Sequence, residues 1–563
     1  MKFETLKKQA LSEWEKLQNS NEPRILVGAA TCGRAAGAIE VIQEFKKELA
    51  ERNIDARLLE VGCLGPCCFE PIVSIAKPHQ PLIIYGKVKP GKVTHLIKDW
   101  LQGENPCSDL ALGLLGDEPL DGIPIFYDHP MLAPQVRIVL KNCGWIDPTD
   151  IKQYLANEGY VGFEKALKMK PEEVVAEVLN SGLRGRGGAG FPTGKKWEIC
   201  RSVKSDKKYV ICNADEGDPG AFMNRSLLEG DPHAVLEGLL IAGYAIGAHE
   251  AYIYIRAEYP LAVEHLQHAI NQMREVGLLG ENILDSNFCF NITIKEGAGA
   301  FVCGEETALI ASIEGRRGMP NTRPPFPAVS GLNGKPTIIN NVETLGTLPH
   351  IMRNGAEWYA QYGTEGSKGT KTFALAGKVK RTGLIEVPIG ITLREIVYDV
   401  GGGIPNNKAF KAVQTGGPSG GCLPASCLDS PVDYESLVAA GSIMGSGGMI
   451  VMDENTCAVD VAHYFLSFTQ NESCGKCVPC RVGTKRMLEI LERIKNGLGK
   501  PEDIDTLESI AETVKAGSLC GLGQTAPNPV LTTVNYFREE YKAHIHDKKC
   551  PAGVCKPLIE YVI

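Results

Sequence analysis

Three cysteines recur at every third position in one short stretch, as Cys474, Cys477 and Cys480, and Cys520 follows further along the chain. A C-x2-C-x2-C loop can direct three thiolates at three corners of a cubane, with a distant cysteine as the fourth ligand. Structural zinc more often takes its ligands from two separated pairs. The spacing therefore predicts a 4Fe–4S cluster, and the alternatives are a cysteine-rich zinc loop or unpaired thiols.

The most glycine-dense segment, residues 182–197, has the residue types of a phosphate-binding loop. Gly185, Gly187 and Gly190 satisfy G-x-G-x-x-G, a pattern that normally follows a strand and opens a helix. Here a helical pattern precedes it and Pro192 follows it, so a conventional Rossmann fingerprint does not fit. Glycines still let backbone N–H groups approach a phosphate closely. Positive charge nearby comes from Arg186, Lys195 and Lys196.

Carboxylates follow two of the predicted strands. Asp215, Glu216 and Asp218 could form an ordinary solvated loop, or could accept hydrogen bonds from ribose hydroxyls and a carboxamide beside a phosphate loop. Glu305 and Glu306 precede a helix, whose N-terminus they could merely cap.

The elements that must position these groups alternate along the chain. Strands are expected at 209–212, 251–255 and 288–294, with helices at 233–247 and 261–276 between them, which predicts a βαβ region with a mainly parallel sheet. Residues 371–403 alternate as in a small β-grasp domain, and the glycines of 416–421 are more typical of a surface turn than of a second phosphate loop. Four helices, the last over 529–544, are expected to bracket the cysteine motif as a bundle.

The N-terminal residues predict a small α/β domain ending near Gly103, with Cys32, Cys63 and Cys67 in loops after strands. It resembles the thioredoxin-like 2Fe–2S domain of the small NADH-dehydrogenase subunit, whose pattern is C-x4-C and later C-x3-C. Gly37 stands where that pattern has its second cysteine, and Cys68 is a possible substitute. A bound 2Fe–2S cluster and a degenerate docking domain both remain open.

Composition sets outer limits. At roughly 150 residues per domain, 563 residues suggest about three to five domains. A net charge of −8 argues against a nucleic-acid or anionic-membrane partner. The longest apolar run, 238–248, is too short to span a bilayer, and the first residues lack the apolar core of a signal peptide. Close cysteine spacings favour metal binding in a reducing compartment over disulfides, so we expect a cytoplasmic protein.

Several motifs together resemble the NADH-binding, FMN-carrying subunit of the respiratory complex I family. In order, they are Gly-Arg-Gly-Gly-Ala-Gly-Phe-Pro-Thr-Gly, Asn-Ala-Asp-Glu, Cys-Gly-Glu-Glu-Thr-Ala-Leu, Pro-Pro-Phe-Pro-Ala, Asn-Asn-Val-Glu-Thr and the four-cysteine motif. The resemblance covers roughly residues 120–541. The loop after Cys520 is similar to the soluble relatives in NAD-linked hydrogenases, formate dehydrogenases and electron-bifurcating complexes.

The resemblance implies binding residues. Those implied for FMN are Gly185, Arg186, Gly187, Gly188, Ala189, Gly190, Gly194, Lys196, Asn213, Asp215, Gly304, Asn340, Asn341 and Thr344. Those implied for NADH are Phe191, Glu216, Asp218, Glu305, Arg323 and Phe326, and Phe301 and Glu306 are further cofactor-binding candidates. Asp218, Arg323 and Phe301 replace the Glu, Lys and Tyr usual in complex I.

The tail carries zinc-ligand types at zinc-like spacing, His544, Cys550 and Cys555, with Cys457 as a possible fourth ligand. Plain reduced thiols are the alternative.

These expectations combine into an α/β multidomain protein. The predicted segments are a thioredoxin-like domain (1–103), a connector (104–150), a Rossmann-like FMN/NADH domain (151–367), a β-grasp, SLBB-like domain (368–453), a helical bundle with the 4Fe–4S cluster (454–544) and a cysteine-containing tail (545–563). The predicted activity is NADH:acceptor oxidoreduction, with Glu216 and Lys196 as orienting residues and other redox subunits as partners. A flavin-free iron–sulfur scaffold is the alternative, and the direction of electron flow and bifurcation stay open.

Overall fold

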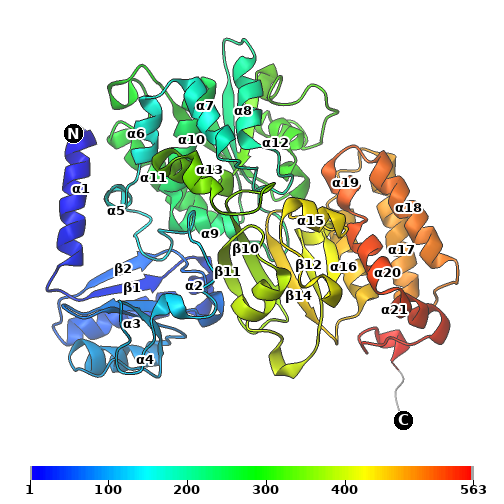
Figure 1. Ribbon diagram of the computed structural model, residues 1–563, viewed down its shortest axis with the longest axis horizontal. Coiled ribbons are helices and arrows are strands. Elements are labelled where there is room, and N and C mark those ends of the chain that lie inside the picture. Colours follow the sequence, from blue (N-terminus) through cyan, green and yellow to red (C-terminus); the bar gives the residue numbers. More distant parts are fainter. Residues whose placement is uncertain (1–2, 560–563) are drawn as a thin grey trace.

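The computed structural model describes residues 3–559; residues 1, 2 and 560–563, at the ends of the predicted first and last segments, lie outside the described residues. Three sheets and a helical bundle follow one another across the molecule (Figure 1). In the part of the chain that the structure describes, no helix is long and apolar enough to cross a membrane.

The central domain is built on a parallel four-stranded sheet with the strand order β8-β7-β6-β9. This arrangement agrees with the predicted βαβ region. Its strands are β6 (Tyr209–Ala214), β7 (Glu250–Arg256), β8 (Asn291–Gly297) and β9 (Thr337–Asn341). Its helices are α5 (Ile151–Ala156), α6 (Val161–Leu167), α7 (Pro171–Asn180), α8 (Thr193–Ser202), α9 (Met223–Gly230), α10 (Pro232–Ile246), α11 (Pro260–Glu275), α12 (Glu306–Ile313), α13 (Val342–Asn354) and α14 (Ala356–Ala360).

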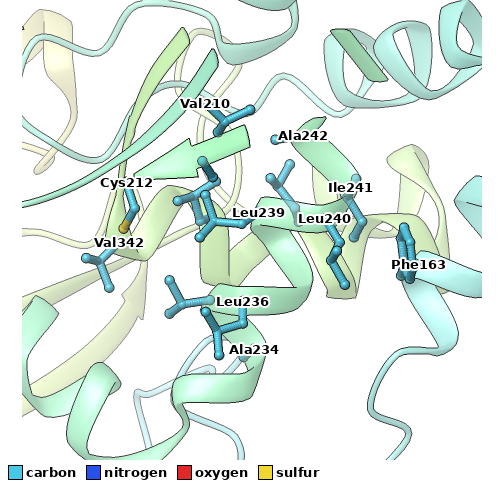
Figure 2. Close-up of a cluster of buried hydrophobic side chains, with 14 of the residues drawn as sticks. Phe163, Val210, Cys212, Ala234, Leu236, Leu239, Leu240, Ile241, Ala242 and Val342 are labelled. Carbon is cyan, nitrogen blue, oxygen red and sulfur yellow. The ribbon is translucent and has the colours of Figure 1, made fainter. Parts of the chain in front are cut away.

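Helix α10 is the centre of this domain's core. It is apolar on nearly every face, as expected of a helix surrounded by protein. The Asp231 side chain caps its start by accepting the Ala234 N–H at 3.3 Å, and Gly247 ends it in the left-handed conformation. In Figure 2 its leucines face Val210 of β6 and Val342 of α13. The core thus fixes β6 and β9, the two strands that carry the site.

The N-terminal sheet has the order β2-β1-β3-β4-β5, with β1 and β2 parallel and the other neighbours antiparallel. Its strands are β1 (Arg24–Gly28), β2 (Arg57–Val61), β3 (Val73–Ala76), β4 (Leu82–Tyr85) and β5 (Ala111–Leu115), and its helices are α2 (Thr31–Ala36), α3 (Ala38–Glu51) and α4 (Pro90–His95). The sheet continues beyond the predicted boundary at Gly103, because β5 pairs with β4 and places Leu114 in the core of this sheet. The segment 104–150 is therefore only partly a connector.

Helix α1 (Phe3–Gln18), at the start of the predicted first domain, packs elsewhere. Its apolar face belongs to the core of the central domain, where the Phe3 ring meets Tyr160 edge-on at 6.4 Å. Lys7 also pairs with Glu164 at 2.6 Å. Helical periodicity predicts that such a face is buried, but it does not say against which domain.

The third sheet has the order β11-β10-β14-β12-β13. Its elements are β10 (Thr370–Gly377), β11 (Gly383–Pro388), β12 (Phe410–Thr415), β13 (Gly421–Pro424), β14 (Gly448–Asp453) and α15 (Tyr434–Ala439). The surface turn expected at 416–421 is buried instead. Gln414 donates to the Gly417 carbonyl at 2.7 Å, and a Cβ at Gly417 would lie 2.6 Å from Asp218 Oδ2. The turn therefore packs against the acidic loop of the central domain.

The C-terminal bundle stands at the far end from the N-terminal sheet (Figure 1). Its helices are α16 (Ala458–Asn471), α17 (Thr484–Lys495), α18 (Asp503–Gly517), α19 (Gly521–Thr525), α20 (Asn528–Tyr536) and α21 (Arg538–Lys542). The helix predicted over 529–544 is broken at Phe537, whose φ of −129° is not helical. Cys550, Cys555 and Leu558 belong to the bundle core, so the described part of the tail is not a separate segment.

Candidate functional site

Polar side chains of β6 and β9 meet at the carboxyl edge of the central sheet. The parallel register sets Asn213 beside Asn341 and Cys212 beside Asn340. In open α/β sheets, ligands bind outside the carboxyl ends of the strands. The sequence thus brings its amide-rich strand ends to the expected edge.

The glycine loop between α7 and α8 has a hydrogen-bonded stem. Gly185 N–H donates to the Phe191 carbonyl and Thr193 N–H to the Leu183 carbonyl, each at 2.9 Å. Gly190 has a φ of 64°, and a Cβ there would lie 2.6 Å from the Tyr434 ring, so both its conformation and its contact need glycine. A Cβ at Gly187 would lie 3.3 Å from that of Asn341, so the loop lies directly on the strand edge.

The side chain of Arg186 is not free to meet a phosphate. It is 1% exposed and donates to the carbonyls of Arg184, Thr370 and Lys368 and to the Tyr359 hydroxyl, at 2.7–3.0 Å. The sequence predicted that this positive charge would lie beside a bound phosphate. The guanidinium instead connects the glycine loop to β10 and α14. Lys195 pairs with Glu198 at the surface, so Lys196 is the remaining lysine at the sheet edge.

Among the described residues, three buried polar atoms at this edge have no hydrogen-bond partner, Asp215 Oδ2, Thr193 Oγ1 and Arg256 Nη1. Burial raises the pKa of Asp215 to about 7, although Arg256 lies 3.6 Å away. Buried polar atoms are nearly always paired, so orphans beside a glycine cradle indicate a bound group with its own donors. Gly304 leaves the space open, because a Cβ there would lie 3.6 Å from Asp215 Oδ2. A flavin, with ribityl hydroxyls and a phosphate, fits these residues.

Other predicted ligands form hydrogen bonds within the protein that hold the site together. Asn340 accepts from Trp197 Nε1 at 3.0 Å, Asn341 caps α13, and Asn213 donates to the Gly304 carbonyl at 2.8 Å. Thr344 accepts the Arg186 N–H at 2.8 Å.

Glu216 is 5% exposed, and its carboxylate accepts the N–H groups of Asn224 and Arg225 at 3.0 and 3.1 Å. Burial raises the pKa of Glu216, while these two N–H groups oppose the shift. It therefore fixes the acidic loop to the start of α9. Beside it, Asp218 accepts from Ser446 Oγ at 2.5 Å, and burial raises the pKa of Asp218 to about 6.

The outer rim is more exposed. Phe191 and Phe326 are 47% and 55% exposed, and the Arg323 guanidinium lies 5.7 Å from the Phe326 ring centroid. Lys196 Nζ contacts Glu306 at 2.6 Å and the Ile339 carbonyl at 3.0 Å. Glu305 caps α12 by accepting the Thr307 and Ala308 N–H groups. Exposed aromatics and a cation beside a sheet edge are suited to a planar, charged ligand.

The four cysteines of the C-x2-C-x2-C motif and its distant partner line one cavity. Its wall consists of Cys474, Cys477, Cys480, Cys520, Val302, Pro320, Ser473, Lys476, Leu519 and Leu522. Val302 comes from the turn Phe301–Gly304, the same turn that faces Asp215 through Gly304. Glu472 Oε2 accepts the Phe301 N–H at 2.9 Å and joins this turn to the bundle. One four-residue turn therefore separates the flavin cradle from the cysteine cavity.

Two further cysteine sets are much more compact. The ligand atoms of Cys457, His544, Cys550 and Cys555 all lie within 4.8 Å of one another, and so do the sulfurs of Cys32, Cys63 and Cys67. His544 Nδ1 is 2.7 Å from the Glu540 carbonyl, so this nitrogen is protonated and Nε2 faces the sulfurs of Cys457 and Cys555, each at 3.4 Å.

Sequence reasoning missed several residues of the site. Ser446 and Gly417 reach the acidic loop from the third sheet, and Tyr434 donates to the Gly185 carbonyl at 2.8 Å. Nothing in their local sequence marks them as site residues. Glu472 had a usable signal, since it lies two residues before Cys474.

Comparison with known proteins decides the family. The chain is 44% identical over 415 residues to the F 2 subunit of the NADH-quinone oxidoreductase of Rhizobium meliloti (strain 1021), covering 74% of this chain and 99% of the relative. The chain belongs to the family of NADH-quinone oxidoreductase F subunits. Three family models match it: the Nuo51 FMN-binding domain over 178–350, the SLBB domain over 372–423 and the NADH-ubiquinone oxidoreductase-F iron–sulfur binding region over 460–544.

Two hydrogenase proteins are also similar to the chain. NADP-reducing hydrogenase subunit HndC of Solidesulfovibrio fructosivorans is 61% identical over 429 residues, covering 76% of this chain and 87% of the relative. A crystal structure of NAD+-reducing [NiFe]-hydrogenase in the H2-reduced state has a TM-score of 0.65 at 31% identity, covering 96% of this chain and 87% of that one. The resemblance stated from sequence, the mixed α/β multidomain class and the FMN and 4Fe–4S cofactors are thereby confirmed.

Proposed function

We propose that this chain is the NADH:acceptor oxidoreductase subunit of a larger redox complex. The observation that carries the proposal is the turn Phe301–Gly304, which faces the flavin cradle through Gly304 and the cysteine cavity through Val302. When bound, FMN exchanges a hydride with NAD(H), and the 4Fe–4S cluster takes electrons singly. The protein holds the two sites on opposite sides of one short, partly buried turn.

The chain's own residues bind, orient and exclude water. The glycine loop 185–194, Asp215 and Gly304 surround the flavin, and Phe191, Asp218, Arg323 and Phe326 meet the nucleotide. Glu216 and Lys196 are positioning residues: Glu216 holds the acidic loop on α9, and Lys196 is held between Glu306 and the end of β9. Hydride transfer needs no proton from a side chain, so neither residue has to act as an acid or a base.

The first domain is thioredoxin-like in this proposal, with boundaries shifted to about 20–116. The parallel pair β1–β2, the interior position of β1 and the hairpin β3–β4 support that topology. We also place the protein in the cytoplasm, since none of the described cysteines forms a disulfide, as expected in a reducing compartment.

Cys457, His544, Cys550 and Cys555 form a structural zinc site in this proposal. Three sulfurs and one imidazole nitrogen, all buried and within 4.8 Å of one another, suit a closed tetrahedral Zn²⁺ site. The site joins the start of α16 to the end of the bundle, so its role is to hold the helices that flank the cluster cysteines.

Electrons leave through partner subunits that carry further redox centres. The names of the relatives, an NADP-reducing and a NAD+-reducing hydrogenase and a quinone oxidoreductase, support hydrogenase-like or other reductase-like partners. A flavin-free scaffold is the second candidate, and the degenerate cysteine pattern of the first domain is the observation that favours it.

An anaerobic NADH titration of the purified protein, with flavin and iron analysis, tests the proposal. We expect about one FMN per chain, with flavin absorbance bleaching before that of the cluster. An iron–sulfur spectrum that NADH leaves unchanged, in a protein without flavin, would refute the proposal and identify a scaffold.

A further inference from the structure

We propose that Cys32, Cys63, Cys67 and Glu70 hold one tetrahedral metal ion, zinc, in place of the 2Fe–2S cluster expected in a domain of this kind. The proposal concerns a different region from the flavin and 4Fe–4S sites and does not depend on them. In this proposal the first domain has a structural role and does not take part in electron transfer.

Three of the distances among these groups are close to those of a mononuclear site, and the pair that stands further apart, by more than 4.8 Å, is Glu70 Oε1 and the Cys67 sulfur. With Zn–S near 2.3 Å and Zn–O near 2.0 Å, the edges of a tetrahedron are about 3.8 Å between sulfurs and about 3.5 Å between sulfur and oxygen. The sulfurs of Cys63 and Cys67 are 3.8 Å apart. Glu70 Oε1 lies 3.7 Å from the sulfur of Cys32 and 3.8 Å from that of Cys63.

A binuclear cluster needs a wider arrangement. It binds its ligands as two pairs, one on each iron, and the pairs stand on opposite sides of the cluster. Here the sulfurs of Cys32, Cys63 and Cys67 all lie within 4.8 Å of one another. The same chain supplies a contrast, because among the described residues Cys474, Cys477, Cys480 and Cys520 form no such compact set and surround a cavity instead.

Glu70 supplies the fourth ligand that the cysteine pattern lacks. Its side chain is buried, with the residue 9% exposed, and Oε2 accepts the Ile72 N–H at 2.9 Å, which leaves Oε1 directed at the thiols of Cys32 and Cys63. Carboxylates are ordinary zinc ligands. Gly28 and Gly33 make room for it, since a Cβ at either position would lie 3.3 Å from Oε2. Gly37, at the position of the missing cysteine, has no side chain to offer.

The loop that carries Cys63 and Cys67 lies where three domains meet. The Gly65 carbonyl accepts the Leu384 N–H at 2.8 Å, and Cys68 N–H donates to the Thr382 carbonyl at 3.1 Å, both in the third sheet's domain. A Cβ at Gly62 would lie 2.4 Å from Gly230 Cα in the central domain.

The loop that carries Cys32 is fastened to the central domain as well. Thr31 N–H donates to Glu229 Oε2 at 2.8 Å, and the Thr31 hydroxyl bonds the same carboxylate. A single ion joining Cys32 to the Cys63–Cys67 loop therefore fixes both docking segments relative to each other. Zinc has no redox chemistry, so its contribution here is to the docking of the domain.

Metal analysis of the full chain tests the proposal. Zinc and iron are counted in the anaerobically purified wild type, in Cys63→Ser and in the control Cys68→Ser, whose thiol lies next to the site but outside the ligand set. We expect about four iron atoms in the wild type, as one 4Fe–4S cluster requires. We expect Cys63→Ser to lose one zinc per chain and no iron, and Cys68→Ser to keep its full metal content.

Two results would overturn the proposal: a wild type with about six iron atoms, two of which Cys63→Ser loses, or metal contents that are the same in all three proteins. If Cys63→Ser does not fold, Glu70→Gln serves, because a weakened ligand should release one zinc to a chelator roughly 10- to 100-fold faster. Unchanged release would also refute the site. FMN content and flavin bleaching by NADH are read separately, so a failure of the proposed oxidoreductase function is distinguished from a failure here.

Discussion

Cysteine side chains are arranged differently in the cysteine cavity of the bundle and in the two compact cysteine sets. The cavity in the bundle is surrounded by Cys474, Cys477, Cys480 and Cys520. Val302, from the turn that separates it from the flavin cradle, lines the same cavity. The compact sets bring their ligand atoms within 4.8 Å of one another, at places where domains or helices meet. The spacing of sulfurs in space thus separates an electron-carrying site from sites that fasten the fold.

The largest expected effect comes from Cys480→Ser. Loss of one cluster ligand should abolish electron transfer to partner subunits, while NADH-to-dye activity, which needs only the flavin, stays largely intact. Iron content and both activities are measured together, with Cys289→Ser, a half-buried cysteine outside all three sets, as the control. Complete loss of dye activity would assign Cys480 a folding role and would contradict the distinction between an electron-carrying site and sites that stabilise the fold.

His544→Ala tests one of the compact sets, the one with Cys457, Cys550 and Cys555. Loss of the structural metal should lower the thermal midpoint of the bundle by roughly 5–15 °C while the wild-type flavin content is kept. His546→Ala is the matched control, because that imidazole is exposed on the same turn. A variant that loses zinc but keeps the wild-type midpoint would show that this set does not fasten the fold.

Asp218 predicts a pH-dependent choice of nucleotide. Burial raises its pKa to about 6, so the carboxylate is charged above that pH and should repel a 2′-phosphate. We expect the preference for NADH over NADPH to decline as the pH falls through 6. In Asp218→Asn the preference should be about tenfold lower at pH 8, which corresponds to about 1.4 kcal/mol, and should no longer vary with pH. Steady-state kcat/KM for both nucleotides measures this, and equal wild-type rates with both would contradict it.

The smallest expected effect concerns the wall between the flavin cradle and the cysteine cavity. Glu472→Gln replaces the charged acceptor of the Phe301 N–H by a neutral one, which weakens that bond by about 1 kcal/mol. We expect reduction of the cluster by NADH to slow about two- to fivefold, with dye activity unchanged, in stopped-flow traces. An equal loss in both assays would mean that the turn positions the flavin rather than the route to the cluster.

Local patterns made much of this predictable. The glycine loop, the cysteine motif and the alternation of strands and helices can each be recognised from a few neighbouring residues, and the strand-end positions of Asn213 and Asn341 follow from them. What could not be predicted depends on contacts between distant segments. The packing of α1 on the central core, the addition of β5 to the first sheet and the burial of the turn at 416–421 are set by tertiary contacts that leave no periodic pattern.

Site chemistry divides in the same way. Residue type suggested that Arg186 would meet a phosphate, but four acceptors, three of them from other segments, engage its guanidinium. Glu70 went unnoticed because a lone glutamate after a cysteine pair has no recognisable spacing. Only its approach to the sulfurs of Cys32 and Cys63 marks it.

The engaged guanidinium of Arg186 has a consequence for how the protein acquires its flavin. Because its partners all belong to the protein, the glycine loop has its final shape before any cofactor arrives. Binding then loses little entropy in ordering the loop, and a pre-organised site of this kind takes up its ligand tightly. We therefore expect newly made chains to complete their folding first and to take up FMN afterwards.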